Sequence, residues 1–334
     1  MHKKLNSDGS NLSIIVQGAI DTSMIKAIVD AYFITFPKCE IIISTWKNSR
    51  LPIIEGVNII MNDDPGSIDL SKYGGRKHDN FNRQIVSSLS GIKLASRDFC
   101  LKVRSDILLE KKNFVDLYNN FNFHHELEKI KNCGFFLVNN ISSKDPYFIY
   151  PAPLHFCDWF ILSTTEEMKK LFNVNLIREN DLYFSKEEKI PKIYSKLSIP
   201  KIKWSVETYI WKEYLSKYID FQMTNTFDNN KEVLDVHDIF LKSHCIISDN
   251  ETIGITMKKK MYTKIKNYRL YSEYSFKDWL YYSEKYKHSK MRKSQLYAEI
   301  IFIKFIKYLY FVIYKSLNPF YVNKIKLFIK KNIE

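Results

Sequence analysis

The sequence feature that most constrains the fold is a series of short apolar runs, each long enough for one buried strand. The first three runs occupy residues 12–18, 40–46 and 57–61 and are rich in isoleucine. Between the first two, residues 21–36 carry apolar side chains at helical spacing. Short buried strands that alternate with helices are typical of a parallel α/β sheet. The pattern predicts an α/β fold whose mainly parallel sheet is flanked by helices.

The same alternation continues along the chain as far as the middle of the sequence. Further elements are predicted as follows: a helix at 79–96 with Asp79 or Asn80 as its N-cap, strands at 99–103, 135–140 and 155–163, a helix at 165–172, and a helix capped by Ser205. Residues 174–203 are polar, lysine-rich and poorly periodic, so we expect a long functional loop there.

The net charge of +14 lies in one part of the chain. Residues 256–334 contain 19 Lys and Arg against 5 Asp and Glu, whereas residues 1–255 contain 32 of each and are neutral. This difference predicts a main domain over residues 1–255 and a basic helical tail over residues 256–334. No nucleic-acid recognition motif accompanies the charge, so a nucleic-acid partner is not expected.

The tail has the composition of a helix that lies in a membrane surface. Residues 296–317 combine apolar and aromatic side chains with lysines, and their longest uncharged run is seven residues, against about 20 needed to span a bilayer. Basic, aromatic, amphipathic helices bind anionic headgroups. The sequence therefore predicts association with an anionic membrane surface. The alternative is that these helices pack onto their own domain or a partner chain.

The cysteines and the N-terminus indicate a cytoplasmic protein. The five cysteines are far apart and form no Cys-x-x-Cys pair, so neither a disulfide framework nor a zinc site is expected. The first 13 residues are polar and lack the apolar run of a signal peptide. With the basic tail, these features predict a cytoplasmic protein that lies peripherally on a membrane.

Asp106 follows the predicted strand at 99–103 and lies where a parallel α/β sheet binds its ligands, outside the carboxyl ends of its strands. A carboxylate in this position caps a helix, pairs with a nearby cation such as Arg104, or binds a metal or substrate. Residues 107–109 continue an apolar run, which argues against a helix cap. The other two alternatives stay open.

A set of short motifs follows in a fixed order. They are VQGAI (16–20), STW (44–46), NDDPG (62–66), NRQIVSSLSGIKLA (82–95), LKVRSDILL (101–109), HFCDWF (155–160), VETYIWKEYL (206–215) and SDNETIGI (248–255). This ordered set resembles the WavE family of bacterial lipopolysaccharide glycosyltransferases, over roughly residues 12–257 and without the tail. The resemblance implies a GT-A-like, Rossmann-type fold. It also implies transfer of a sugar from a nucleotide-sugar donor, with a UDP-sugar as one candidate, to a lipopolysaccharide, lipooligosaccharide or capsule acceptor.

The resemblance also implies which residues bind the donor. They are Gln17, Gly18, Thr45, Asp63, Asp64, Asn82, Arg83, Arg104 and Asp106. Arg83 is near a helix N-terminus, where the helix dipole attracts phosphate. Structural alternatives exist for several of them: a strand-to-helix turn at Gln17 and Gly18, a turn at Asp63 and Asp64, and an exposed helix residue at Arg83.

A divalent cation is implied by the same resemblance, because Mn²⁺ or Mg²⁺ neutralises the charge of a nucleotide diphosphate leaving group. Asp106 matches the last acid of the Asp-x-Asp motif of GT-A glycosyltransferases, and His244 is the predicted second metal ligand, with His237 as its alternative. Arg104 stands where the motif has its first acid. Either Asp106 holds a metal ion, or the guanidinium of Arg104 itself contacts the diphosphate.

If the reaction inverts the anomeric carbon, a general base must deprotonate the acceptor hydroxyl. By analogy with the late acidic motif of inverting GT-A enzymes, Glu207 is the first candidate for this base, and Asp158 is the second. The structural alternatives are a favourable charge at a helix N-terminus for Glu207 and a satisfied buried carboxylate for Asp158. Two other functions remain compatible with the sequence: a retaining or sugar-phosphate transferase, and a non-catalytic GT-A-like membrane scaffold.

Overall fold

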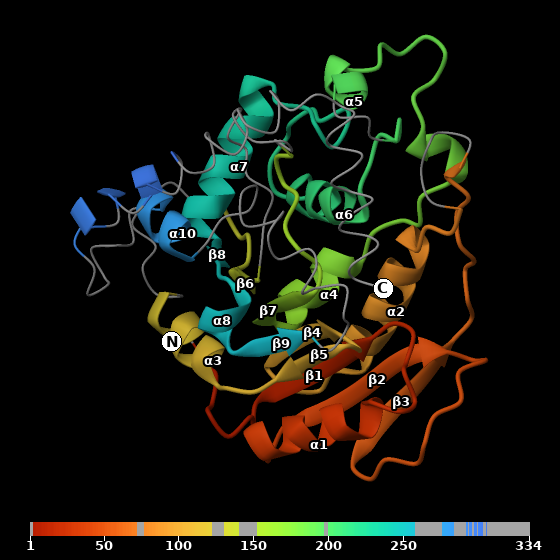
Figure 1. Cartoon of the computed structure of the whole chain (residues 1–334), viewed down its shortest axis with the longest axis vertical. Coiled ribbons are helices and arrows are strands. Elements are labelled where there is room, and N and C mark those ends of the chain that lie inside the picture. Colours follow the sequence, from red (N-terminus) through yellow and green to blue (C-terminus); the bar gives the residue numbers. More distant parts are fainter. Residues whose placement is uncertain are drawn as a thin grey trace, which may run out of the picture. The chain divides into compact units, whose positions relative to one another are not determined.

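The centre of the chain is a seven-stranded sheet with the order β3-β2-β1-β4-β7-β6-β8 (Figure 1). The computed structural model describes residues 3–71, 77–121, 130–139, 152–196, 200–257 and 276–283, and single positions between 292 and 305. The strands are β1 (Leu12–Gln17), β2 (Glu40–Trp46), β3 (Val57–Asn62), β4 (Phe99–Arg104), β6 (Phe136–Val138), β7 (Phe160–Thr164) and β8 (Cys245–Ile247). Only β7 of these strands runs antiparallel to its neighbours. The predicted α/β class and mainly parallel sheet are confirmed.

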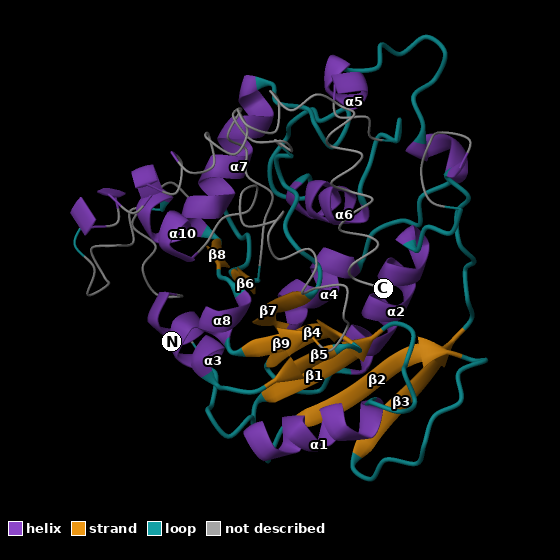
Figure 2. Cartoon of the chain, in the orientation of Figure 1, coloured by secondary structure: helices purple, strands orange, loops and turns teal. Residues whose placement is uncertain are grey.

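Helices cover both faces of this sheet (Figure 2). The helices of the described residues are α1 (Ile25–Thr35), α2 (Phe81–Leu94), α3 (Asn113–Phe121), α4 (Thr165–Phe172), α5 (Lys192–Lys196), α6 (Val206–Leu215), α7 (Lys231–Ser243), α8 (Asn250–Ile253) and α10 (Phe276–Tyr282). Two short strands, β5 (Ile107–Leu109) and β9 (Ile255–Met257), form a separate antiparallel pair. Helices α2, α4 and α6 pack side by side in one layer.

The close approach of α2 to the sheet depends on a glycine. A Cβ atom at Gly91 would lie 2.4 Å from Ile15 Cγ2 and 3.0 Å from Ser44 Cβ, both shorter than ordinary contact. Helix α2 therefore rests directly on β1 and β2. Since a helix in a β-α-β connection runs antiparallel to its strands, the first turn of α2 lies at the carboxyl edge of the sheet.

The strand order reverses between β1 and β4. The chain passes from β1 to β2 to β3 in one direction and then returns through α2 to place β4 on the other side of β1. Because such crossovers are right-handed, α1 and α2 cover opposite faces of the sheet. In open α/β sheets, ligands bind outside the carboxyl ends of the strands at this switch point.

The strands of the centre are buried on both faces because most of their residues are apolar. All six residues of β1 are buried, and five of the six residues of β4 are buried. An aromatic cluster fills the space between α6, α7 and β6, and its members are Phe136, Phe156, Trp211, Tyr214 and Phe240. This packing fixes α6, the helix that carries Glu207, against the sheet.

The predicted strand at 155–163 is wrong in its first half. Strand β7 begins at Phe160, so Asp158 lies before the strand and not on it. Before the strand, the side chain of Lys102 donates to the Asp158 carbonyl. The Arg104 N–H still donates to the Trp159 carbonyl at 3.2 Å, one position beyond the last strand pair. The predicted loop at 174–203 also contains a short 3₁₀ helix (Glu179–Leu182) and α5.

Most other predicted elements are confirmed, with ends that differ by a few residues. The helix at 165–172 and the strand at 40–46 have the predicted bounds. Ser205 caps α6, because its Oγ accepts from the N–H of Thr208 at 3.2 Å. Asn80 is the N-cap residue of α2, although its own side chain makes no capping bond.

The chain divides into two compact units, Met1–Trp279 and Leu280–Glu334. Among the residues that the structure describes, none belongs to a helix long and apolar enough to cross a membrane. Most of the predicted basic tail, including 306–334, lies outside the described residues.

Candidate functional site at the carboxyl edge of the sheet

The loops that follow β1 and β4 are joined at the switch point. The Ser105 N–H donates to the Gln17 carbonyl at 3.2 Å, and the Ser105 hydroxyl donates to the Ala19 carbonyl at 2.6 Å. Gly18 lies between these contacts with φ +110°, a left-handed value that favours glycine, and no atom of the described residues other than its chain neighbours lies within 4 Å of the place where a Cβ would be. The end of β1 is therefore open on this side.

Arg104 and Asp106 form a two-bonded ion pair beside this opening. Arg104 Nε donates to Asp106 Oδ1 at 3.1 Å, and Nη2 donates to Oδ2 at 2.8 Å. The guanidinium carbon lies 4.9 Å from the centre of the Trp159 ring, within the range of a cation–π contact. The predicted indole beside Asp158 thus contacts an arginine.

Lys102 is a fully buried cation on the same face of β4 as Arg104. Its Nζ lies 3.1 Å from Asp158 Oδ2 and also donates to the Asp158 carbonyl. The Lys102 side chain is 0% exposed and that of Asp158 is 7% exposed, so neither charge is compensated by water. Alternate residues of a strand share a face. From this face Lys102 contacts Asp158 and Arg104 contacts Trp159, the two residues that precede β7.

Glu207, in the first turn of α6, lies within electrostatic reach of Asp158. Burial raises the pKa of the Glu207 carboxyl above its ordinary value; a positive charge on His155 opposes the rise, and the negative charge of Asp158 adds to it. His155 is held by the start of the same helix, since its Nδ1 lies 2.9 Å from the Ser205 hydroxyl. The structure thus places both predicted base candidates in one cluster.

The first turn of α2 and the end of β3 form a second charged group at this edge. Arg83 donates to both carboxylate oxygens of Asp64, at 2.7 and 2.6 Å. This bidentate contact lowers the pKa of Asp64. Lys47 lies 2.7 Å from Asp63, whose side chain is 86% exposed. Three of the predicted donor-binding residues, Arg83, Asp63 and Asp64, are therefore paired with opposite charges.

Three other predicted donor-binding residues take part in contacts within the fold. Asn82 exchanges two hydrogen bonds of 3.0 Å with the backbone of Ile177. Gln17 is buried and donates to the Ser87 hydroxyl at 2.6 Å. Thr45 is fully buried, with its hydroxyl 3.1 Å from that of Ser49.

The prediction that Asp106 and His244 bind one metal ion is wrong, because the structure places the two residues at opposite edges of the sheet. His244 precedes β8, which runs parallel to β6, so it lies at the amino edge of the sheet, opposite Asp106. Its Nε2 accepts from the Ile130 N–H at 3.0 Å, and its Nδ1 lies 3.1 Å from the Gly134 carbonyl. The alternative, His237, is fully buried and its Nδ1 accepts from the Leu154 N–H at 3.1 Å.

The donor set does not fit a divalent cation. Among the described residues, no three His, Cys, Asp or Glu side chains are grouped as metal ligands. A cation bound to Asp106 would also lie close to the Arg104 guanidinium. Even two unit charges 4 Å apart repel by about 4 kcal/mol at an effective dielectric constant of 20, and a divalent ion doubles that value. We therefore derive no step that uses a bound metal.

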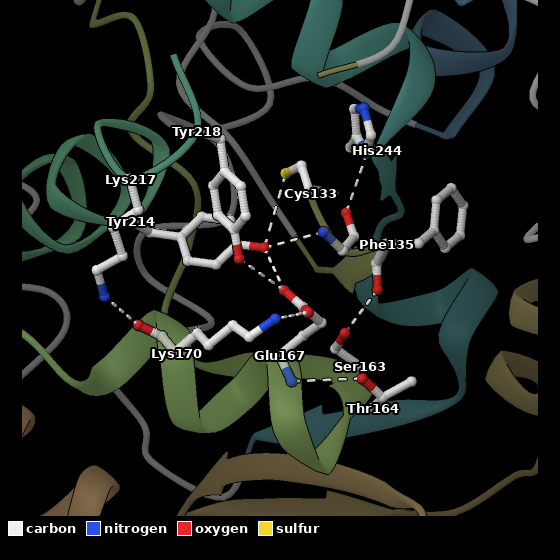
Figure 3. A network of polar contacts seen from close by, with 11 residues as sticks. Cys133, Phe135, Ser163, Thr164, Glu167, Lys170, Tyr214, Lys217, Tyr218 and His244 are labelled. Atoms are coloured by element: carbon white, nitrogen blue, oxygen red, sulfur yellow. Dashed lines mark hydrogen bonds and ion pairs between the residues drawn. The ribbon is translucent and has the colours of Figure 1, made fainter. Parts of the chain in front are cut away.

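A second polar network lies at the amino edge and anchors the other end of α6 (Figure 3). The Tyr214 hydroxyl donates to Glu167 Oε2 at 2.6 Å and accepts from the Gly134 N–H at 3.0 Å. Lys170 Nζ donates to the other oxygen of this carboxylate, Glu167 Oε1, at 2.7 Å. Burial raises the pKa of the neighbouring Cys133 thiol to about 12, so the thiol stays protonated. The network ties α6 to α4 and β6, which orients the helix that carries Glu207.

The sequence matches the profile of one protein family, described as WavE lipopolysaccharide synthesis, over residues 12–310. The chain belongs to the WavE family. The match passes residue 257, the limit expected from the motifs, and so includes part of the basic tail. No curated protein matches the chain.

Three solved structures that have a remote likeness to the chain are two of the galactosyltransferase LgtC and one of a mannosyltransferase. An active-site mutant of LgtC has 7% identity and a TM-score of 0.32, and the match covers 72% of this chain and 73% of that one. LgtC in complex with donor and acceptor sugar analogs has 8% identity and a TM-score of 0.31, with the same coverage. The mannosyltransferase PcManGT from Pyrobaculum calidifontis, solved with GDP-Man and Mn²⁺, has 9% identity, a TM-score of 0.30, and coverage of 48% and 46%. The family assignment rests on the sequence match.

Sequence reasoning missed Lys102 and His155. Lys102 had a signal, because it is the single charged residue inside the apolar run Phe99–Val103, and a charge buried in a sheet requires a partner. His155 had no local signal, since it belongs to the site only through its contact with Ser205, 50 residues later.

Proposed function

We propose that this WavE protein is a GT-A-like glycosyltransferase that moves a sugar from a nucleotide-sugar donor to a lipopolysaccharide, lipooligosaccharide or capsule acceptor. One observation carries the proposal: the switch point between β1 and β4 combines an open glycine turn with charged groups from β4, the segment before β7, and α6. Such an edge is the usual ligand site of an open α/β sheet. A non-catalytic scaffold has no need for carboxylates gathered there.

The roles follow from the chemistry of each group. The donor's phosphates bind near Arg104 and the first turn of α2, where the helix dipole favours anions. Arg83 reaches a phosphate there only by exchanging its contacts with Asp64. The acceptor hydroxyl lies toward Glu207 and Asp158, one of which removes its proton as the new glycosidic bond forms. Glu207 is the better base, because Asp158 is already neutralised by Lys102.

A donor screen tests this function. UDP-, GDP-, ADP- and CMP-sugars are incubated with the full chain in EDTA, Mg²⁺ or Mn²⁺, and both nucleotide binding and nucleotide release are measured. We expect one donor class to bind and to release nucleotide, and Asp106→Ala to weaken this binding because Arg104 loses the carboxylate that orients it. Asp30→Ala, which removes an exposed carboxylate paired with Lys26 on α1, is the matched control. A folded chain that binds no donor under any condition would contradict the proposal.

We further propose that the tail holds the enzyme on an anionic membrane, peripherally on the cytoplasmic face of the inner membrane. The support is an exposed apolar face within the second unit: Tyr297, Ile301 and Phe305 recur at helical spacing and are 52%, 46% and 55% exposed. Phe302 beside them is 64% exposed. Apolar side chains on a basic helix bury themselves at the acyl boundary of a membrane.

Deletion of residues 296–334 is expected to abolish co-sedimentation of the chain with phosphatidylglycerol vesicles. The full chain should bind these vesicles in low salt and lose most of its binding in high salt, since screening weakens lysine–headgroup attraction. Vesicles of phosphatidylcholine alone are the control, and Phe302→Ser with Phe305→Ser separates apolar from charge contributions. Equal vesicle binding by the truncated and full chains would reject the membrane proposal.

A further inference from the structure

We propose that the guanidinium of Arg104, in place of a divalent cation, neutralises the diphosphate of the nucleotide-sugar donor. This inference rests on the proposed function and adds to it that donor binding requires no metal ion. It is carried by three features of the carboxyl edge: the contacts of Asp106, the placement of Arg104, and the lack of further ligands among the described residues.

The first feature is that both oxygens of Asp106 already have a charged partner. Arg104 donates to each of them, through Nε at 3.1 Å and through Nη2 at 2.8 Å. A cation at Asp106 would have to replace these contacts and remain beside a like charge. The Asp106 side chain is 12% exposed, so water screens that repulsion only weakly. In this site Asp106 acts as the group that orients Arg104.

The second feature is that Arg104 is fixed and still has donors to offer. Trp159 supports one face of the guanidinium, and Asp106 holds the Nε and Nη2 side. Nη1 donates to no group of the described chain, and the side chain is 30% exposed. Arginine forks match the oxygens of a phosphate and bind them bidentately. A guanidinium held in this way meets the diphosphate with little loss of side-chain freedom.

The third feature is the absence of a second ligand near Asp106 among the residues described. The residue two positions earlier, which would supply the nearest acid, is Arg104 itself. Asp158 is paired with the buried Lys102, and His244 lies at the opposite edge of the sheet with both ring nitrogens in contact with backbone. One carboxylate, already in use, is too small a donor set for Mg²⁺ or Mn²⁺.

The test measures binding of UDP, GDP and ADP to the full chain by calorimetry, first in EDTA and then with Mn²⁺ or Mg²⁺. We expect one nucleotide diphosphate to bind in EDTA, with an affinity that added metal changes by less than about threefold. Arg104→Ala should weaken this binding about 10- to 100-fold, and Arg104→Lys should restore only part of it, because lysine keeps the charge and lacks the fork. Arg178→Ala removes an exposed arginine paired with Asp181 and should leave binding unchanged.

Circular dichroism and thermal unfolding of each variant confirm that the chain is folded, and the electron paramagnetic resonance signal of free Mn²⁺ shows directly whether the wild-type chain takes up the ion. Binding that appears only after metal is added, or an Arg104→Ala chain that binds as well as wild type in EDTA, would overturn this inference and leave the proposed function standing. No binding of any nucleotide diphosphate or nucleotide-sugar, with or without metal, would overturn both.

Discussion

Replacement of Glu207 by glutamine is expected to lower kcat for sugar transfer by about 100- to 10,000-fold, the usual contribution of a general base. Glutamine keeps the size and polarity of the side chain and removes its capacity to take a proton. Donor affinity should not change, because Glu207 lies on the acceptor side of the proposed site. Steady-state kinetics and nucleotide binding on the same preparation separate the two effects. Glu213→Gln changes a glutamate on the same helix that pairs with Lys212 and serves as the control.

The pH dependence of the wild-type enzyme tests the same assignment. A base must be ionised, and burial raises the pKa of Glu207, so its carboxyl is protonated at pH values where an ordinary glutamate is already charged. On the acid side of the pH profile, kcat/KM should therefore fall at pH values above the ordinary pKa of a glutamate. Glu207→Gln should remove this acid-side dependence on pH. If Asp158→Asn removes this dependence and Glu207→Gln does not, Asp158 is the base.

The central strands β1, β2 and β4 could be predicted from sequence because burial on both faces leaves a mainly apolar run, whereas β3, predicted as buried, is largely exposed at the edge of the sheet. Residues 40–46 form β2 with the predicted bounds for this reason. The run at 155–163 is misleading, because Phe156, Trp159 and Phe160 continue the apolar pattern, whereas the chain before Phe160 is held by Lys102 and Arg104. A strand that is interrupted by a tertiary ion pair carries no local signal of the interruption.

The carboxyl edge could also be predicted, since Gly18 and Asp106 lie within three residues of the ends of two apolar runs that form neighbouring parallel strands. The pairing of charges could not. Arg83 meets Asp64 across 19 positions, and this contact depends on how α2 starts beside the end of β3. Only the family resemblance pairs His244 with Asp106. The short strand β8 that follows His244 is not among the predicted strands, and its direction decides at which edge the histidine lies.

Lys102→Met is expected to lower the free energy of unfolding by about 3–5 kcal/mol, the usual effect of removing one partner from a buried ion pair. Methionine fills a similar volume, so the loss comes from the Asp158 carboxylate, which stays buried with its charge uncompensated. Urea unfolding followed by circular dichroism measures the change. Lys26→Met, at an exposed pair on α1, should change stability by no more than about 0.5 kcal/mol.

The double variant Lys102→Met/Asp158→Asn distinguishes the charge effect from a packing effect. It removes both charges, so it should recover a large part of the stability lost in the single variant, because replacing both partners of a buried pair is far less costly than breaking it. If the double variant is as unstable as the single one, the defect lies in packing around β4. A further outcome is a double variant that recovers stability and still lacks transfer activity. That result would show that the fold does not need the charges of Lys102 and Asp158, and that the two residues serve to shape the site.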